Sequence, residues 1–164
     1  MWLGISIDKT RSDSGMIEVE QAVKDTVSEI MAIARGALLD QGTFLPTAVV
    51  HTKDGLFPLL LPFKNEKQKK ALVDMVKKEA VRLHAYAVTT ITCARIVDAR
   101  TGEEEESLVL ITAIRGGAPH IAEQSFKRGK NRVVLYFGEI CEGDSAGRPG
   151  QMMILPDWND EPVH

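Results

Sequence analysis

The chain has 164 residues, of which 44% are hydrophobic and 26% charged, and its formal net charge is −3 at pH 7. These values are typical of one soluble globular domain with its own core, and the negative charge argues against binding nucleic acid through phosphate neutralisation alone. Two cysteines are too few for a disulfide framework, and no stretch resembles a membrane span or a signal peptide. The sequence therefore predicts a cytoplasmic protein.

The first residues form an apolar segment followed by a polar joint. Residues 1–7 alternate roughly in polarity, as a short strand does, whereas residues 8–15 are polar and turn-prone. We expect residues 1–15 to be an N-terminal arm. The sequence leaves open whether this arm docks on its own sheet or on a neighbouring molecule.

Apolar positions predict a first helix over residues 17–39, because they recur with a period of about 3.6 residues. Gly42, just past the last of them, suits the left-handed cap that ends many helices. Gly36 lies inside the pattern, where it costs about 1 kcal/mol relative to alanine. Either the helix bends at Gly36 or another backbone comes close, and the small residues around it favour the second.

A β-hairpin is predicted where two apolar runs, residues 43–52 and 56–63, flank Lys53-Asp54-Gly55. Asp-Gly in a short connection is a strong hairpin signal, because glycine adopts positive φ without strain. Three prolines interrupt the runs: Pro46, Pro58 and Pro62. Since proline lacks the N–H that a ladder needs, we expect at least one of these strands at a sheet edge.

Residues 65–83 are predicted to form a second helix. Asn65 can cap its first turn, and Gln68, three residues later, is the partner expected in a capping box. Residues 64–82 hold seven lysines and arginines against three acidic residues, a net charge of +4. The outer face of this helix is therefore basic.

Four further strands are predicted between residues 86 and 137, where runs rich in Val, Ile, Thr and aromatics alternate with glycine or charged clusters. The first of them, residues 86–98, has no clearly polar face and suits a central strand. Residues 138–150 hold four glycines and several acids, which favours a loop. The apolar tail around Trp158 needs a host surface.

These elements predict an α+β fold in a single domain of residues 1–164. We expect an antiparallel five- to six-stranded sheet with two helices packed on one face, in the order α-β-β-α-β-β-β-β. Residues 143–164 are expected to be a loop followed by the apolar tail.

The same order of signals resembles small conserved hypothetical proteins of bacteria and phages. The resemblance covers residues 17–140 and involves Ala37-Leu-Leu-Asp-Gln-Gly-Thr43, the hairpin at Lys53-Asp54-Gly55, and Ala85-Tyr-Ala-Val-Thr-Thr-Ile91 before a long charged hairpin. It implies an α+β fold and supplies no catalytic residue.

Side chains able to bind a metal ion or act in catalysis are scattered along the chain: His51, Asp54, Asp98, His120, Glu139 and Cys141. None has the spacing of a known metal motif, so a divalent-metal hydrolase would require them to converge in space. Cys93, inside an apolar strand, is predicted to be a small core residue. Cys141 is predicted to be unreactive, because nearby carboxylates disfavour its thiolate.

The chain ends favour a protein that acts by contact, and we predict a non-catalytic interaction or self-associating module without a cofactor. The proposed contact residues are the apolar side chains of the two ends: Trp2, Leu3, Met152, Ile154, Leu155 and Trp158. Two alternatives remain, the hydrolase and a nucleic-acid accessory protein. The accessory protein would use the phosphate-binding side chains of the second helix: Lys67, Lys70, Lys77, Lys78 and Arg82. The absence of aromatics on that helix weighs against it.

Overall fold

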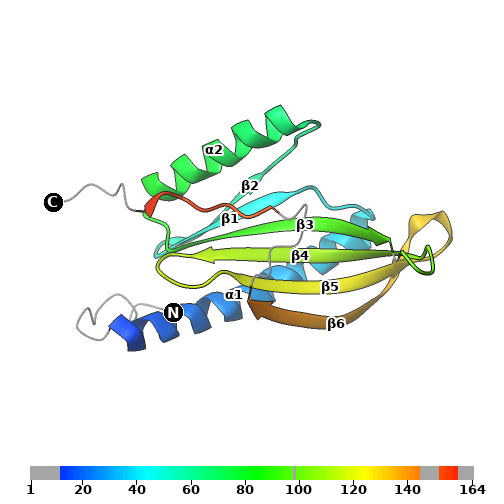
Figure 1. The fold of residues 1–164 in the computed structure, drawn as a ribbon, viewed down its shortest axis with the longest axis horizontal. Coiled ribbons are helices and arrows are strands. Elements are labelled where there is room, and N and C mark those ends of the chain that lie inside the picture. The colour runs from blue at the N-terminus through cyan, green and yellow to red at the C-terminus, as the bar shows by residue number, and fades with distance from the viewer. Residues whose placement is uncertain (1–11, 98, 145–151, 159–164) are drawn as a thin grey trace.

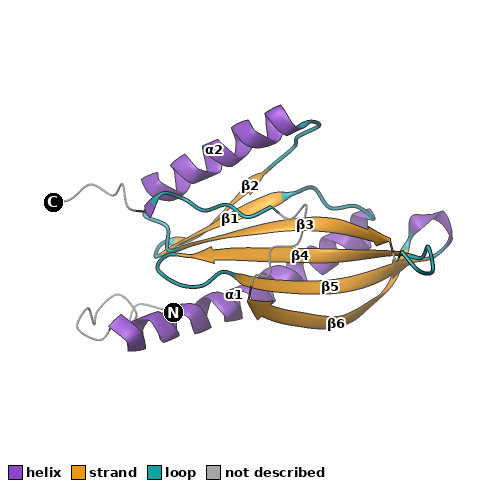
Figure 2. Ribbon diagram, in the orientation of Figure 1, coloured by secondary structure: helices purple, strands orange, loops and turns teal. Residues whose placement is uncertain are grey.

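The computed structural model describes residues 12–97, 99–144 and 152–158. It contains two α-helices and a six-stranded antiparallel sheet with the strand order β2-β1-β3-β4-β5-β6 (Figure 1 and Figure 2). The elements in chain order are α1 (Ser12–Gln41), β1 (Thr47–Thr52), β2 (Gly55–Leu60), α2 (Glu66–Arg82), β3 (Ala87–Val97), β4 (Glu104–Ile114), β5 (His120–Arg128), the 3₁₀ helix η2 (Lys130–Arg132) and β6 (Val134–Asp144). The predicted α+β class and element order are confirmed. No described helix has the length and apolar character needed to cross a membrane.

The two helices lie on opposite faces of the sheet, so the prediction that both pack on one face is wrong. Neighbouring residues of β1 show the division: Val49 packs with α1, and Val50 packs with α2. Successive side chains of a strand point to opposite faces, so two different layers cover this one strand. Each helix needs only one apolar surface, and the sheet offers two.

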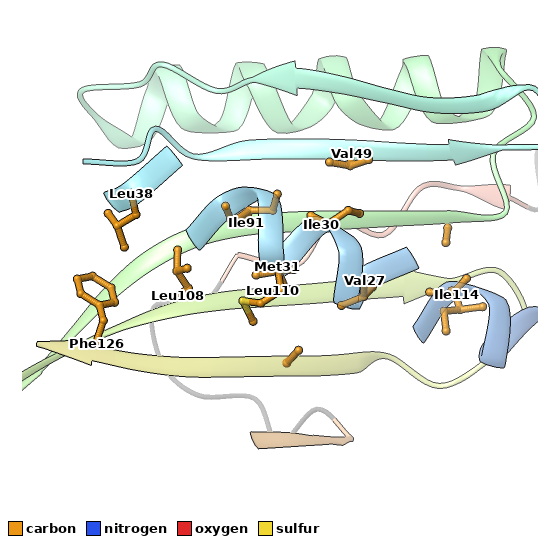
Figure 3. Packing of buried hydrophobic residues seen from close by; sticks show 14 of the residues in the cluster. Val27, Ile30, Met31, Leu38, Val49, Ile91, Leu108, Leu110, Ile114 and Phe126 are labelled. Atoms are coloured by element: carbon orange, nitrogen blue, oxygen red, sulfur yellow. The ribbon is translucent and has the colours of Figure 1, made fainter. Parts of the chain in front are cut away.

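The larger core lies between α1 and the central strands. Figure 3 shows side chains of α1, among them Val27 and Met31, pointing toward residues of the sheet such as Ile91 and Leu110. Phe126, at 1% exposure, fills the end of this layer on β5. Burying a large side chain contributes roughly 1.5–3 kcal/mol, so this layer supplies much of the driving force for folding.

The smaller core lies on the other face, under α2 and the C-terminal segment. Val76 and Ala80 of α2 pack there with residues of β1 and β3. Met152 and Ile154 are 6% and 1% exposed in the same cluster. Thr90 Oγ1 donates a hydrogen bond of 2.6 Å to the Met152 carbonyl, which attaches this segment to β3. The chain's own sheet is therefore the host surface for the apolar tail.

Helix α1 begins earlier than the sequence indicated. It begins at Ser12, so residues 12–15 belong to a helix rather than to an arm. It ends as predicted at Gly42, which has φ +77° and donates its N–H to the Leu38 carbonyl at 2.8 Å. The rest of the predicted arm, residues 1–11, lies outside the described residues.

Gly36 has no close neighbour, contrary to the expectation of an approaching backbone. A Cβ built at this position meets nothing within 4 Å, and the residue is exposed on α1. We therefore expect Gly36→Ala to raise the free energy of unfolding by about 0.5–1 kcal/mol, because alanine loses less conformational entropy in a helix. Urea denaturation checks this. Destabilisation by the substitution would contradict the exposed placement.

The predicted hairpin and the second helix cap are confirmed. Gly55 has φ +138° in the turn that joins β1 to β2. At the start of α2, Asn65 Oδ1 accepts the Gln68 N–H at 2.9 Å. Gln68 Oε1 accepts the Lys64 N–H at 2.8 Å, one residue before the position of the usual capping box.

The last strand is longer than the sequence indicated, and the predicted loop after Phe137 is wrong as far as Asp144. β6 has eleven residues and continues through Gly138 to Asp144. A Cβ at Gly138 would lie 2.6 Å from Ser125 Oγ, so glycine permits a close approach at the register shift between β5 and β6. The glycine here belongs to a β-bulge rather than to a loop.

Arg128, at the end of β5, joins three parts of the fold. Its Nε donates to Glu106 Oε2 of β4 at 2.5 Å, and its Nη1 donates to the carbonyls of Gly42 and Arg132 at 2.7 and 2.8 Å. Its guanidinium lies 5.3 Å from the centre of the Phe126 ring. The side chains of Arg128 and Glu106 are only 12% and 17% exposed, so solvent screens this ion pair weakly.

Candidate functional site: the open edge at β6

The scattered catalytic candidates do not form a site. His51 and His120 are buried on β1 and β5, with β3 and β4 between them. Asp54 lies in the first hairpin turn, and Glu139 and Cys141 are exposed on β6. Asp98 lies outside the described residues. No group of three or more His, Cys, Asp or Glu side chains within residues 12–97, 99–144 and 152–158 could hold a metal ion.

A buried polar row runs under α1. His51 Nε2 lies 2.7 Å from Thr89 Oγ1, which lies 2.7 Å from Thr112 Oγ1 on the next strand. His51 is fully buried, and its ring meets Tyr86 edge-on with centroids 5.8 Å apart. Burial lowers the pKa of His51 to about 4 and also raises the pKa of Tyr86. A substrate could not reach these groups, so the row is part of the core.

The two cysteines are both exposed, so the prediction that Cys93 is a core residue is wrong. Cys93 of β3 pairs with Leu108 of β4, which belongs to the larger core. The part of its thiol that the sheet covers, together with the Glu106 carboxylate, raises the pKa of Cys93 to about 11. The thiol is therefore protonated at neutral pH and a poor nucleophile.

The predicted contact residues of the C-terminal segment are divided between the core and the surface. Met152 and Ile154 are buried in the chain's own core, so their side chains do not face a partner in this structure. Leu155 is 54% exposed, and Trp158 is half-buried. Trp2 and Leu3 lie outside the described residues. As a binding surface for another molecule, this set stays a prediction.

The edge at β2 is blocked by a proline. The Leu61 N–H donates to the Pro46 carbonyl at 2.8 Å, which fixes the residues whose backbone groups face β1. Because these groups alternate in an antiparallel ladder, those of Leu56, Pro58 and Leu60 point away from β1. Pro58 has no N–H, so the outer side of this strand lacks its central donor. The predicted edge strand with proline is confirmed.

The edge at β6 has no proline, and no strand of the described residues pairs with its outer side. The Arg115 N–H donates to the Tyr86 carbonyl at 2.8 Å, which fixes the alternation in β4. In an antiparallel sheet, the backbone groups of successive residues point to alternate neighbouring strands. When this rule is applied to the residue pairs of β4 with β5 and of β5 with β6, the backbone groups of Cys141 face β5. Those of Ile140 and Glu142 therefore point outward. The register is regular from Ile140 to Asp144, and the nearer register shift lies directly before Ile140.

The side chains along β6 make the open edge both apolar and acidic. Leu135, Tyr136 and Ile140 are 61%, 55% and 42% exposed. By sequence the strand carries three acidic residues and no lysine or arginine. A long edge with exposed apolar side chains and free backbone groups is a template for pairing with another strand.

The basic face of α2 lies elsewhere, on the opposite side of the molecule from α1. Three of the five predicted phosphate contacts, Lys77, Lys78 and Arg82, line one surface cavity, and Lys67 and Lys70 are exposed away from it. Arg82 already pairs with Glu79, whose carboxylate lies 2.6 Å from its Nη2. The guanidinium and its hydrogen bonds lower the pKa of Glu79.

No protein-family model, curated protein or solved structure matches this chain. Sequence reasoning missed the β6 edge because it ended the strand at Phe137. The signal that could have revealed it is the pair of apolar residues Ile140 and Cys141, which interrupts the glycines and acids after Phe137.

Proposed function

We propose that this chain is a non-catalytic protein-interaction module that binds an extended segment of a partner by adding it to the sheet at β6. The observation that carries the proposal is the outward direction of the Ile140 and Glu142 backbone groups on an edge without proline. Backbone hydrogen bonds supply affinity in strand addition, and side chains at alternate positions supply specificity.

The chemistry of the edge defines the partner segment. Ile140 offers an apolar contact, and Glu139 and Glu142 are exposed carboxylates beside it. Opposite charges on directly facing strand residues are favourable, whereas like charges are unfavourable. Ile140 and Glu142 share one face of the strand, and Glu139 lies on the other. In a segment that alternates apolar residues with lysine or arginine, the cations lie on one face, so they meet Glu142 or Glu139 in either orientation.

Self-association through two β6 edges is the second candidate, and the exposed apolar side chains of the strand favour it. Symmetric pairing would bring together two strands that each carry three acidic residues and no basic one. Because this repulsion is screened at high salt, such a dimer should form more readily as ionic strength rises. A basic partner strand would show the reverse salt dependence.

Ile140→Pro tests the proposal. We expect this variant to stay folded, because the Ile140 N–H points outward and serves no bond to β5. It should bind a short peptide of alternating valine and lysine at least about tenfold more weakly than the wild type, since one backbone donor is lost and the edge is obstructed. Isothermal titration calorimetry measures the affinity.

Two matched controls separate edge pairing from charge and from misfolding. Cys141→Pro removes an N–H that faces β5 and should lower the stability of the sheet, unlike Ile140→Pro. A peptide of the same sequence with N-methylated backbone keeps the charge but cannot form the ladder, and it should not bind. Equal binding of the two peptides, or undiminished binding by Ile140→Pro, would overturn the proposal.

A further inference from the structure

A surface cavity of about 460 Å³ lies between α2 and the C-terminal segment. Its lining residues are Lys77, Lys78, Val81, Arg82, Leu155 and Asp157. Four of these residues belong to α2 and two to the C-terminal segment. Figure 1 shows where the two segments lie in the fold. The cavity therefore exists only because the C-terminal segment folds back on its own sheet.

The charge of the cavity is positive. Three of the six lining residues are cations and one is an acid. Arg82 is largely neutralised by Glu79, whereas Lys77 and Lys78 form no ion pair or hydrogen bond with another residue of 12–97, 99–144 or 152–158. Lys77 is also half-buried. An anion bound in the cavity would offset its excess positive charge.

The remaining wall is apolar. Val81 is half-buried on α2, and Leu155 is 54% exposed on the facing segment. The buried neighbours Met152 and Ile154, and the hydrogen bond from Thr90 to the Met152 carbonyl, hold Leu155 in place. A ligand that covered Val81 and Leu155 would remove apolar surface from water.

We propose that this cavity binds a small anion that carries an apolar group, with a phosphate or carboxylate between Lys77 and Lys78 and the apolar group between Val81 and Leu155. The proposal is carried by two ammonium groups without a partner among the described residues and two aliphatic side chains that line the same cavity. An inorganic anion would contact only the two lysines, and a neutral apolar molecule would contact only Val81 and Leu155.

Calorimetric titration with phenyl phosphate, inorganic phosphate and benzyl alcohol tests both halves. Phenyl phosphate should bind at least about tenfold more tightly than either other compound, because each lacks one group of contacts. Benzyl phosphonate and phenylacetate then distinguish a preference for phosphate from one for any anion. Equal affinity for phenyl phosphate and inorganic phosphate, or no binding by either, would overturn the proposal.

Substitutions on one helix supply the control. The double variant Lys77→Gln/Lys78→Gln should lose about tenfold in phenyl phosphate affinity, whereas Lys67→Gln/Lys70→Gln, on the same helix outside the cavity, should bind as the wild type does. Both should melt as the wild type does, since none of the four lysines is fully buried. If both weaken binding equally, and an oligonucleotide competes with a steep salt dependence, α2 is a nucleic-acid surface and the cavity proposal is wrong.

The two proposed sites lie on different elements and can fail separately. Ile140→Pro should leave the affinity for phenyl phosphate unchanged, and Lys77→Gln/Lys78→Gln should leave the affinity for the valine-lysine peptide unchanged. Loss of both affinities in either variant would mean that one surface had been assigned wrongly.

Discussion

Arg128→Met is expected to lower the free energy of unfolding by about 3 kcal/mol. The substitution keeps an apolar stem over the Phe126 ring but removes every hydrogen bond of the guanidinium. It leaves the Glu106 carboxylate only 17% exposed, with Arg132 as a weaker partner at 3.7 Å. It also removes the donor to the Gly42 carbonyl at the end of α1. Because these contacts join three elements, the loss should exceed that of a surface ion pair.

A double-mutant cycle with Glu106→Gln measures the ion-pair part of this loss. We expect the double variant to be more stable than the sum of the single losses predicts, by about 1.5 kcal/mol, because each single variant leaves a largely buried charge without its partner. Urea denaturation at neutral pH supplies all the values. A loss below about 1 kcal/mol in Arg128→Met would show that solvent screens this pair as it does an exposed one.

Acidification should destabilise the fold through His51. The imidazole is fully buried, and its Nδ1 has no hydrogen-bond partner among the residues that the structure describes. Protonation would place a second N–H in this apolar setting, which is why burial lowers the pKa of His51 from 6.5 to about 4. Between these two values the unfolded chain binds the proton and the folded chain does not.

Stability therefore falls as the pH falls from 6.5 toward 4. The slope from this residue is about 1.4 kcal/mol per pH unit, and the total loss is about 3 kcal/mol. His51→Leu removes the titrating group. Between pH 6.5 and 4, the free energy of unfolding of this variant should therefore depend on pH less steeply than that of the wild type, by about 1.4 kcal/mol per pH unit. Urea midpoints at several pH values measure the difference. Equal slopes for wild type and variant would show that the imidazole is solvated or paired in the folded protein.

Local patterns predicted most of the fold because they act within a few residues. The apolar period gave α1, the Asp54-Gly55 pair gave the first hairpin, and Asn65 with Gln68 gave the start of α2. Each depends on backbone geometry and on neighbours close in sequence, which a linear pattern contains.

The features that the sequence did not reveal depend on contacts between distant residues. β6 continues past Gly138 because a register shift against β5 accommodates it, and the glycine alone favoured a loop. The helices occupy opposite faces because β1 is buried on both sides. Met152 and Ile154 have the apolar character of a binding surface, yet they complete the chain's own core. The composition of a segment shows that its apolar side chains must be covered, but not which surface covers them.

Backbone amide exchange measured by NMR tests the open edge most directly. In the free protein we expect the N–H groups of Cys141 and Gly143 to exchange slowly and those of Ile140 and Glu142 to exchange quickly, because only the first pair faces β5. Saturation with the valine-lysine peptide should slow the exchange of Ile140 and Glu142 at least about tenfold. Slow exchange of Ile140 and Glu142 in the free protein, or peptide binding that leaves both unprotected, would contradict strand addition at β6.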